Sequence, residues 1–258
     1  MKRLTEHNYW ESNYLGQAAS TQAPLTGFSN HCNRLILREL LRAGLAGKRV
    51  LEIGAGNSFW LPYLATQFPT SQFTGLDYSE QGCQLLNQRA VKANVKIDIH
   101  CVDMFKPSPQ LLGMFDLVIS FGVVEHFDDL GKTLSSMKAY LSREGKLFTT
   151  IPNMAGLLGT LTNRFNPNVY QQHNPHDLPS FLEGHRQAGL KTFDAGYLGS
   201  TNFGVLSSCY GPKNDLKRQI GRVLMGVSVA TWWVDQYVGE LPCSKTFSPY
   251  IYALSQAA

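Results

Sequence analysis

The sequence lacks the cysteine pairs that mark a disulfide framework. Its five cysteines are scattered, and none belongs to a C-x-x-C motif: Cys32, Cys83, Cys101, Cys209 and Cys243. An odd number of isolated thiols is typical of a reducing compartment, and their spacing argues against a zinc site. The first residues also lack the apolar core of an export signal. We therefore expect a cytoplasmic protein.

Charge is sparse as well. Charged residues make up 16% of the chain, and the net charge of +4 is spread without a long basic run. A nucleic-acid-binding surface needs a dense basic patch, so no nucleic-acid partner is expected. The chain is instead predicted to act on a small molecule.

Long hydrophobic runs are missing too. The most apolar stretch, residues 223–234, is too short and too interrupted to span a bilayer. It belongs to a predicted helix from about Asn214 to Val238, which we expect to pack on the domain or in a dimer interface. Contact with a membrane surface, or an apolar wall of a substrate pocket, is the less favoured alternative. The protein is expected to be a monomer or a homodimer.

Apolar strands alternate with amphipathic helices through the middle of the chain. Strands are predicted near residues 50–53, 72–76, 96–102, 117–119 and 146–151, and a helix is predicted at 30–43. The helix after the second strand should be capped by Ser79, and the helix after the fourth by Asp128 or Asp129. Such alternation predicts parallel βαβ units and therefore an α/β fold.

A glycine turn follows the first predicted strand. Gly54 and Gly56 stand between that strand and a helix that should begin near Phe59, with Asn57 or Ser58 as its cap. Glycines here allow a sharp turn and let a ligand approach the backbone. The third glycine of the dinucleotide fingerprint is replaced by Phe59, which disfavours NAD and FAD.

Two carboxylates end the next two strands. Asp77 follows the second strand, where it can accept hydrogen bonds from both hydroxyls of a ribose, and Asp103 follows the third. Because the ends of neighbouring parallel strands meet at one edge of a sheet, these residues and the glycine turn should lie side by side. Together they suit a ligand with a zwitterionic tail, a ribose and an adenine.

These motifs resemble those of the class I S-adenosylmethionine-dependent methyltransferases. The matching stretches are residues 52–56, 75–79, 101–105, 115–120 and 124–127, in the family's order and spacing. The resemblance covers roughly residues 48–152. It implies S-adenosylmethionine as the cofactor and a doubly wound, Rossmann-like sheet of seven strands, the last antiparallel. Strands six and seven are then expected near 191–198 and 249–255.

The resemblance also implies a division of the chain. Residues 1–46 would form an N-terminal lid segment and a helix, and residues 47–258 the cofactor-binding domain. Two insertions, 153–177 after strand five and 199–246 after strand six, would build the acceptor side. Three aromatic residues of the N-terminal segment would close the site: Tyr9, Trp10 and Tyr14. A loosely docked tail is an equal alternative for this segment.

Individual site residues follow from the same resemblance. Glu52 would orient the glycine loop and approach the methionine ammonium, unless it forms a structural ion pair with Arg49 or a lysine. The remaining cofactor contacts would come from the glycine turn and the strand ends: Gly54, Ala55, Gly56, Asp77, Tyr78, Asp103, Met104 and Phe121.

The acceptor side should contain a general base. Glu125 and His126 follow the fourth strand, and His126 is the leading candidate because imidazole titrates near neutrality. His173 and His176 in the first insertion are reserve candidates, or part of a polar surface loop. Polyprenyl-catechol O-methyltransferases carry another Glu three positions before the Glu-His pair, where this chain has Gly122, so no metal is predicted.

The expected reaction is methyl transfer to a hydroxyl, or to an amine, of a small molecule. The alternatives are an N-methyltransferase that relies on alignment alone, and a non-catalytic cofactor-binding partner subunit.

Overall fold

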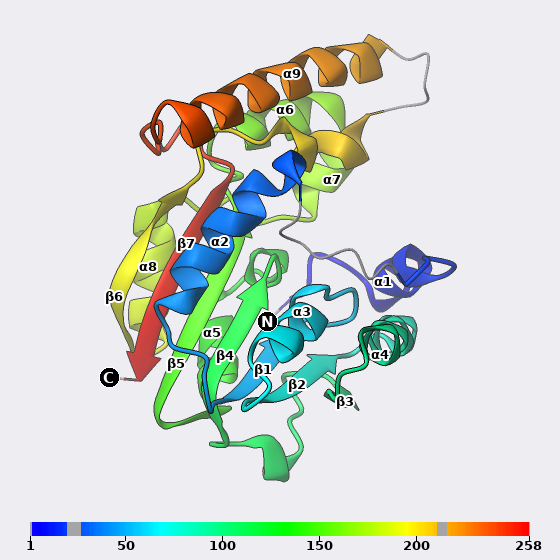
Figure 1. Cartoon of the computed structure of the whole chain (residues 1–258), viewed down its shortest axis with the longest axis vertical. Coiled ribbons are helices and arrows are strands. Elements are labelled where there is room, and N and C mark those ends of the chain that lie inside the picture. Colours follow the sequence, from blue (N-terminus) through cyan, green and yellow to red (C-terminus); the bar gives the residue numbers. More distant parts are fainter. Residues whose placement is uncertain (1, 20–26, 211–215, 258) are drawn as a thin grey trace.

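A mostly parallel sheet forms the centre of the molecule (Figure 1). The computed structural model describes residues 2–19, 27–210 and 216–257. These form seven strands in the order β3-β2-β1-β4-β5-β7-β6. Their bounds are β1 (Arg49–Ile53), β2 (Gln72–Asp77), β3 (Asp98–Cys101), β4 (Phe115–Phe121), β5 (Leu141–Pro152), β6 (Leu190–Leu198) and β7 (Tyr250–Ala257). β7 runs antiparallel to β5 and β6, whereas the pairs among β1 to β5 are parallel. The predicted fold class is confirmed.

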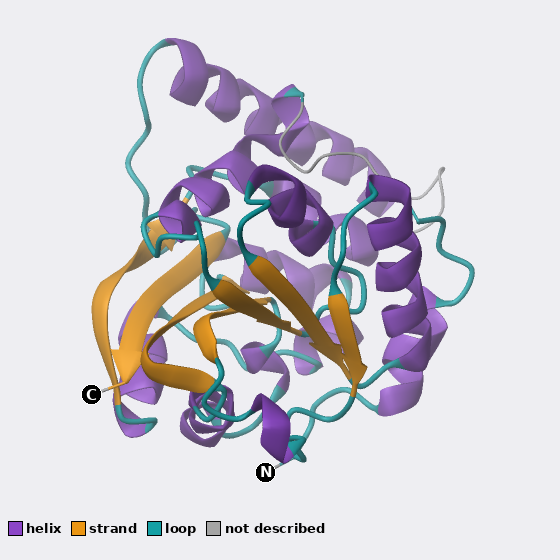
Figure 2. Ribbon diagram, turned by 60° about the horizontal axis from the view of Figure 1, so that its bottom comes forward, coloured by secondary structure: helices purple, strands orange, loops and turns teal. Residues whose placement is uncertain are grey.

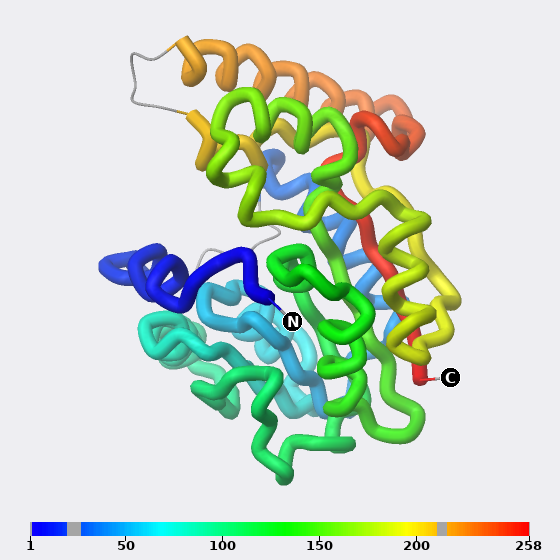
Figure 3. Tube along the Cα trace, turned by 180° about the vertical axis from the view of Figure 1, so that it is seen from behind, coloured from blue at the N-terminus to red at the C-terminus, as the bar shows by residue number. Residues whose placement is uncertain are grey.

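Helices cover both faces of this sheet (Figure 2). One face carries α2 (His31–Leu41), α3 (Trp60–Gln67) and α4 (Glu80–Ala93), which bury Leu40, Leu61 and Leu86. The other face carries α5 (Leu130–Lys138) and α8 (Leu178–Gln187), which bury Leu134 and Phe181 (Figure 3). Each such side chain contributes about 1.5–3 kcal/mol through removal from water, so the two clusters hold the strand ends rigidly.

The helices next to the strand ends begin at polar caps. The Ser79 hydroxyl accepts a hydrogen bond from the Gly82 amide at the start of α4, and Asp129 accepts one from Lys132 at the start of α5. Both predicted caps are confirmed. At α3 the N-cap residue is Phe59, which makes no side-chain cap bond, but the Ser58 hydroxyl accepts from the Leu61 amide at 3.1 Å.

The two insertions fold together beyond one end of the sheet (Figure 1). The first contains α6 (Leu157–Phe165) and α7 (Pro167–Gln171), and the second contains η4 (Phe203–Cys209) and α9 (Leu216–Tyr237). The predicted start of the last helix, Asn214, lies outside the described residues. α9 packs on α2, where the Asp235 carboxylate lies 3.1 Å from the Nε2 atom of His31. Within the insertion, the indole N–H of Trp232 donates to the Thr201 carbonyl at 2.7 Å. Among the described helices, none has the length and hydropathy needed to cross a membrane.

The N-terminal segment lies along the sheet edge that carries the glycine turn. α1 (His7–Tyr14) packs beside α4, and the Glu11 carboxylate accepts from the Glu80 amide at 2.7 Å. Upstream of α1, the Leu4 amide donates to the His126 carbonyl at 2.8 Å. These contacts place α1 and the residues before it across the ends of β1, β2 and β4. Residues 20–26 of the predicted N-terminal segment lie outside the described residues.

Candidate active site

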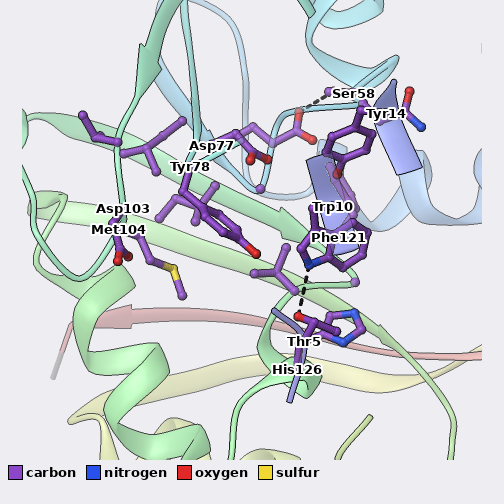
Figure 4. A pocket seen from close by; sticks show the side chains of 18 of the residues that line it. Thr5, Trp10, Tyr14, Ser58, Asp77, Tyr78, Asp103, Met104, Phe121 and His126 are labelled. Carbon is purple, nitrogen blue, oxygen red and sulfur yellow. Dashed lines mark hydrogen bonds between the residues drawn. The ribbon is translucent and has the colours of Figure 1, made fainter. Parts of the chain in front are cut away.

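A cavity of about 250 Å³ opens at the carboxyl ends of β1, β2 and β4. Figure 4 shows side chains from the N-terminal segment and from these strand ends around one space. Ten of the predicted site residues line the cavity: Trp10, Tyr14, Glu52, Gly54, Asp77, Tyr78, Asp103, Met104, Phe121 and His126. The strand ends therefore meet as the sequence pattern predicts.

The glycine turn is shaped by the space around it. Gly54 has a φ of 80°, and a β-carbon there would lie 2.4 Å from a methyl carbon of Val123. A β-carbon on Gly56 would lie 2.8 Å from an Asp77 carboxylate oxygen. The Gly56 and Ser79 amides each donate to Asp77 at 2.8 Å. The turn thus forms a cradle that only glycine permits, with a carboxylate at its edge.

Glu52 is a buried carboxylate on the cavity wall. It accepts a hydrogen bond from the Ser58 hydroxyl at 2.7 Å, and burial raises its pKa to about 8. Arg49 pairs instead with Asp116, at 3.3 Å, so the ion pair considered for Glu52 and Arg49 is not formed. A carboxylate held this way, at a cradle for a polar tail, has the chemistry required to receive an ammonium group.

The Asp103 side of the cavity is lined by Tyr78 and Met104. The Arg3 guanidinium pairs with the Asp103 carboxylate at 2.6 Å and lies 4.6 Å from the centre of the Tyr78 ring. Asp103 also accepts from the Phe105 amide at 3.0 Å. The N-terminal segment is thereby joined to a strand end at which the resemblance places the adenine.

Two aromatic residues of α1 line the cavity as well, Trp10 and Tyr14. Trp10 stacks on Tyr14 with ring centres 5.9 Å apart, and its N–H donates to the Thr5 hydroxyl at 3.1 Å. The Trp10 edge meets His126 at 5.3 Å between ring centres. Tyr9 packs against Trp10 but does not line the cavity.

His126 is almost completely buried between the cavity and the first insertion. Its Nδ1 lies 2.7 Å from the Gln172 carbonyl, and a carbonyl can only accept, so Nδ1 carries the proton. Burial and the neighbouring His173 lower the pKa of His126 to about 4. At neutral pH the ring is therefore uncharged, with the lone pair on Nε2.

The other predicted site residues lie outside the cavity lining. Ala55 and Gly56 form the back of the turn, and His173 packs behind His126 with ring centres 4.6 Å apart. Glu125 is buried, and burial raises its pKa to about 8. His176 is buried in the insertion, away from the lining residues.

Several residues that line the cavity were not predicted from the sequence. They include Arg3 and Thr5 before α1, and Asn57, Ser58, Phe59 and Trp60 after the glycine turn. Trp60 stacks on Phe121 at 5.1 Å, which makes one wall aromatic. The position of Phe59 and Trp60 at the start of a helix that follows a ligand-binding turn was the available signal. Nothing in the sequence around Arg3 indicated its contact with Asp103.

The sequence is similar to those of known methyltransferases. Residues 51–147 match the model of a methyltransferase domain family. A ubiquinone biosynthesis O-methyltransferase of Aromatoleum aromaticum is 29% identical over 182 residues, which cover 67% of this chain and 75% of that protein. Its counterpart in Chromobacterium violaceum is 25% identical, over 55% of this chain and 61% of that protein.

A solved structure has the same fold. The geranyl diphosphate C-methyltransferase of Streptomyces coelicolor A3(2), in complex with Mg²⁺, geranyl diphosphate and S-adenosyl-L-homocysteine, superposes with a TM-score of 0.60 at 14% identity, and the match covers 100% of both chains. The domain match, the relatives and the strand order all indicate a methyltransferase.

The chain is a class I S-adenosylmethionine-dependent methyltransferase. In this methyltransferase the family's motifs lie on the ends of β1, β2 and β4 and just after β3, around the cavity described above.

Proposed function

We propose that this methyltransferase transfers a methyl group to a hydroxyl of a small molecule, with His126 as the proton acceptor. The observation that carries the proposal is that His126 lines the same cavity as Glu52 and Asp77. An acceptor beside His126 would therefore share one enclosed space with the cofactor.

The cofactor would be held by the residues of the glycine turn and the strand ends. Glu52 would receive the ammonium of the methionine tail, and Asp77 the ribose hydroxyls. The adenine would lie between Tyr78, Asp103 and Met104. Gly54 would present its backbone to the methionine tail, while Ala55 and Gly56 shape the turn behind it. Phe121 would contribute to the wall between the two substrates. S-adenosylmethionine supplies a methyl group already activated on a sulfonium.

The protein's main task is then alignment and exclusion of water. Trp10 and Tyr14 cover the cavity from the lid, and Trp60 and Phe121 form the aromatic wall. Holding two reactants in line replaces an encounter in solution and can supply about 7–11 kcal/mol of the barrier. An aromatic enclosure suits an acceptor with a flat or apolar body.

His126 supplies the proton chemistry. A neutral hydroxyl is a poor nucleophile until its proton leaves, and the uncharged Nε2 of His126 can accept that proton as the methyl moves. The low pKa makes it a weak base, but one that is unprotonated throughout the neutral range. The O-methyltransferase names of the curated relatives support a hydroxyl acceptor.

The test is the variant His126→Ala, assayed by release of S-adenosylhomocysteine with a panel of phenols and amines. Turnover should fall by about 10²–10⁴-fold with phenols, while cofactor affinity stays within about twofold, because only proton transfer is lost. His100→Ala, which removes a histidine paired with Asp98 on β3, is the control.

The pH dependence of the wild-type turnover number should also report the protonation of the His126 ring. Turnover should stay level from pH 7 to about 5 and fall as pH drops through about 4, since the folded pKa lies far below 6.5. Full activity of His126→Ala with phenols would contradict the base. Activity with amines alone would favour the N-methyltransferase alternative.

A further inference from the structure

A buried carboxylate and two imidazoles meet behind the cavity wall. Glu125, His126 and His173 each offer one ligand atom within 4.8 Å of the other two. Glu125 and His126 belong to η3 (Val124–His126), whereas His173 comes from the first insertion, just after α7. Residues 47 positions apart in the chain are thus brought to one point.

One of the two carboxyl oxygens of Glu125 has no partner. The residue is 1% exposed, and its Oε2 atom makes no hydrogen bond with any residue that the structure describes. Leaving a buried carboxylate oxygen unpaired costs free energy that a cation would recover.

Both imidazoles point one nitrogen away and leave the other free to bind. His126 donates from Nδ1 to the Gln172 carbonyl, and His173 from Nδ1 to the Val169 carbonyl, each at 2.7 Å. Each Nε2 therefore keeps its lone pair. Backbone carbonyls that fix the tautomer and ring orientation in this way are the usual outer support of metal-binding histidines.

The insertion is fastened to η3 next to this cluster. The Asn174 amide donates to the Glu125 carbonyl at 2.6 Å, and its side chain reaches the Phe127 carbonyl at 3.5 Å. The backbone around all three side chains is thereby held, so that binding needs only small side-chain movements.

We propose that Glu125, His126 and His173 bind one divalent first-row transition cation. Two imidazoles and one carboxylate suit Zn²⁺, Fe²⁺, Mn²⁺ or Co²⁺ and leave coordination positions open. Bonds of about 2.0–2.2 Å require ligand atoms closer than 4.8 Å, so the cation would draw the three groups together.

The site would change the chemistry of the neighbouring cavity. His126 lines that cavity, so an open coordination position beside it could receive the oxygen of an acceptor. In the cation-bound state the charge of the metal would lower the pKa of a bound hydroxyl, and the proton-accepting task of Nε2 would pass to it. This effect rests on the proposed function, whereas cation binding itself does not.

The test is a Co²⁺ titration of the full chain, freed of any affinity tag and stripped with a chelator, followed by visible absorption. The wild type should bind one Co²⁺ per chain and show ligand-field bands, and Zn²⁺ should displace it. Glu125→Gln and His173→Gln should each weaken binding by at least about tenfold. His176→Gln, a buried histidine of the same insertion, should bind like the wild type.

Thermal unfolding without metal shows whether each variant is folded. A wild-type protein that binds no Co²⁺ would overturn the proposal even if both variants fail to fold. Equal binding by the wild type and the two variants would overturn it as well. Cation binding without methyl transfer would contradict only the proposed function, because the titration uses neither cofactor nor acceptor.

Discussion

Glu52 is a single buried carboxyl group that can couple cofactor binding to the release of a proton. Burial raises its pKa to about 8, so the free protein holds it protonated at pH 6.5. An α-amino group, with a pKa of about 7.7–8.0, is still charged at that pH. If the ammonium of the cofactor's methionine tail docks at Glu52, its positive charge favours the ionised form of the Glu52 carboxyl group. The carboxyl proton must then leave to solvent when the cofactor binds.

We therefore predict that S-adenosylhomocysteine binding at pH 6.5 releases close to one proton per chain. Isothermal titration in buffers of different ionisation enthalpy measures this number directly. Glu52→Gln, which cannot ionise, should release almost none and bind about tenfold or more weakly, since one charge-assisted hydrogen bond is lost. Identical proton release in the two proteins would show that the ammonium docks elsewhere.

The same shift affects stability in the cofactor-free protein. The folded pKa of Glu52 is raised above the value of an exposed glutamate, so its contribution to the free energy of unfolding is complete below about pH 4.5 and is lost as pH rises towards 8. His126 acts in the opposite sense, because its folded pKa is lowered to about 4 and its contribution is lost as pH falls from about 6.5 to 4.

At the scale of elements, the N-terminal segment is tied to the site at several points. Arg3 pairs with Asp103, Leu4 joins η3, and Glu11 accepts amides at the start of α4. Trp10 and Tyr14 line the cavity between these anchors. These contacts favour a lid over a loose tail.

Deleting residues 1–16 should leave a folded protein with turnover lowered by about tenfold or more, because water enters the site. Near-wild-type circular dichroism would show that the fold remains. The double variant Lys217→Ala and Arg222→Ala, on the far helix α9, is a control for surface changes and should keep its turnover. A truncated protein as active as the full chain would make the segment a tail.

The core elements were predictable because each follows a short-range rule. β4 was expected around residues 117–119 and runs from Phe115 to Phe121, and α9 ends at Tyr237, one residue before the expected end. β6, which the family resemblance placed at 191–198, runs from Leu190 to Leu198. Ser79 and Asp129 cap helices where the pattern of polar and apolar residues places them. The first insertion was read as polar sequence, yet it folds into α6 and α7 because Leu158 packs against Phe203 and Leu206 of η4. That contact lies between distant segments and leaves no local signal.

At the scale of the whole molecule, the strand order explains why the cofactor residues were found and their partners were not. Glu52, Asp77 and Asp103 end or follow neighbouring parallel strands, so topology alone places them together. The approach of Arg3 to Asp103 and of His173 to His126 depends on how the N-terminal segment and the first insertion fold back. No metal was predicted because Gly122 stands where a metal-binding subgroup of the family has a glutamate. His173 brings a different third ligand atom to Glu125 and His126.

The central claim is that one cavity at the strand ends binds the S-adenosyl cofactor. Isothermal titration of the wild-type protein with S-adenosylhomocysteine and, separately, with NAD tests it most directly. We predict one molecule of S-adenosylhomocysteine bound per chain and no binding heat with NAD, because Phe59 replaces the third glycine of the dinucleotide turn. Binding of NAD without binding of S-adenosylhomocysteine would contradict the account.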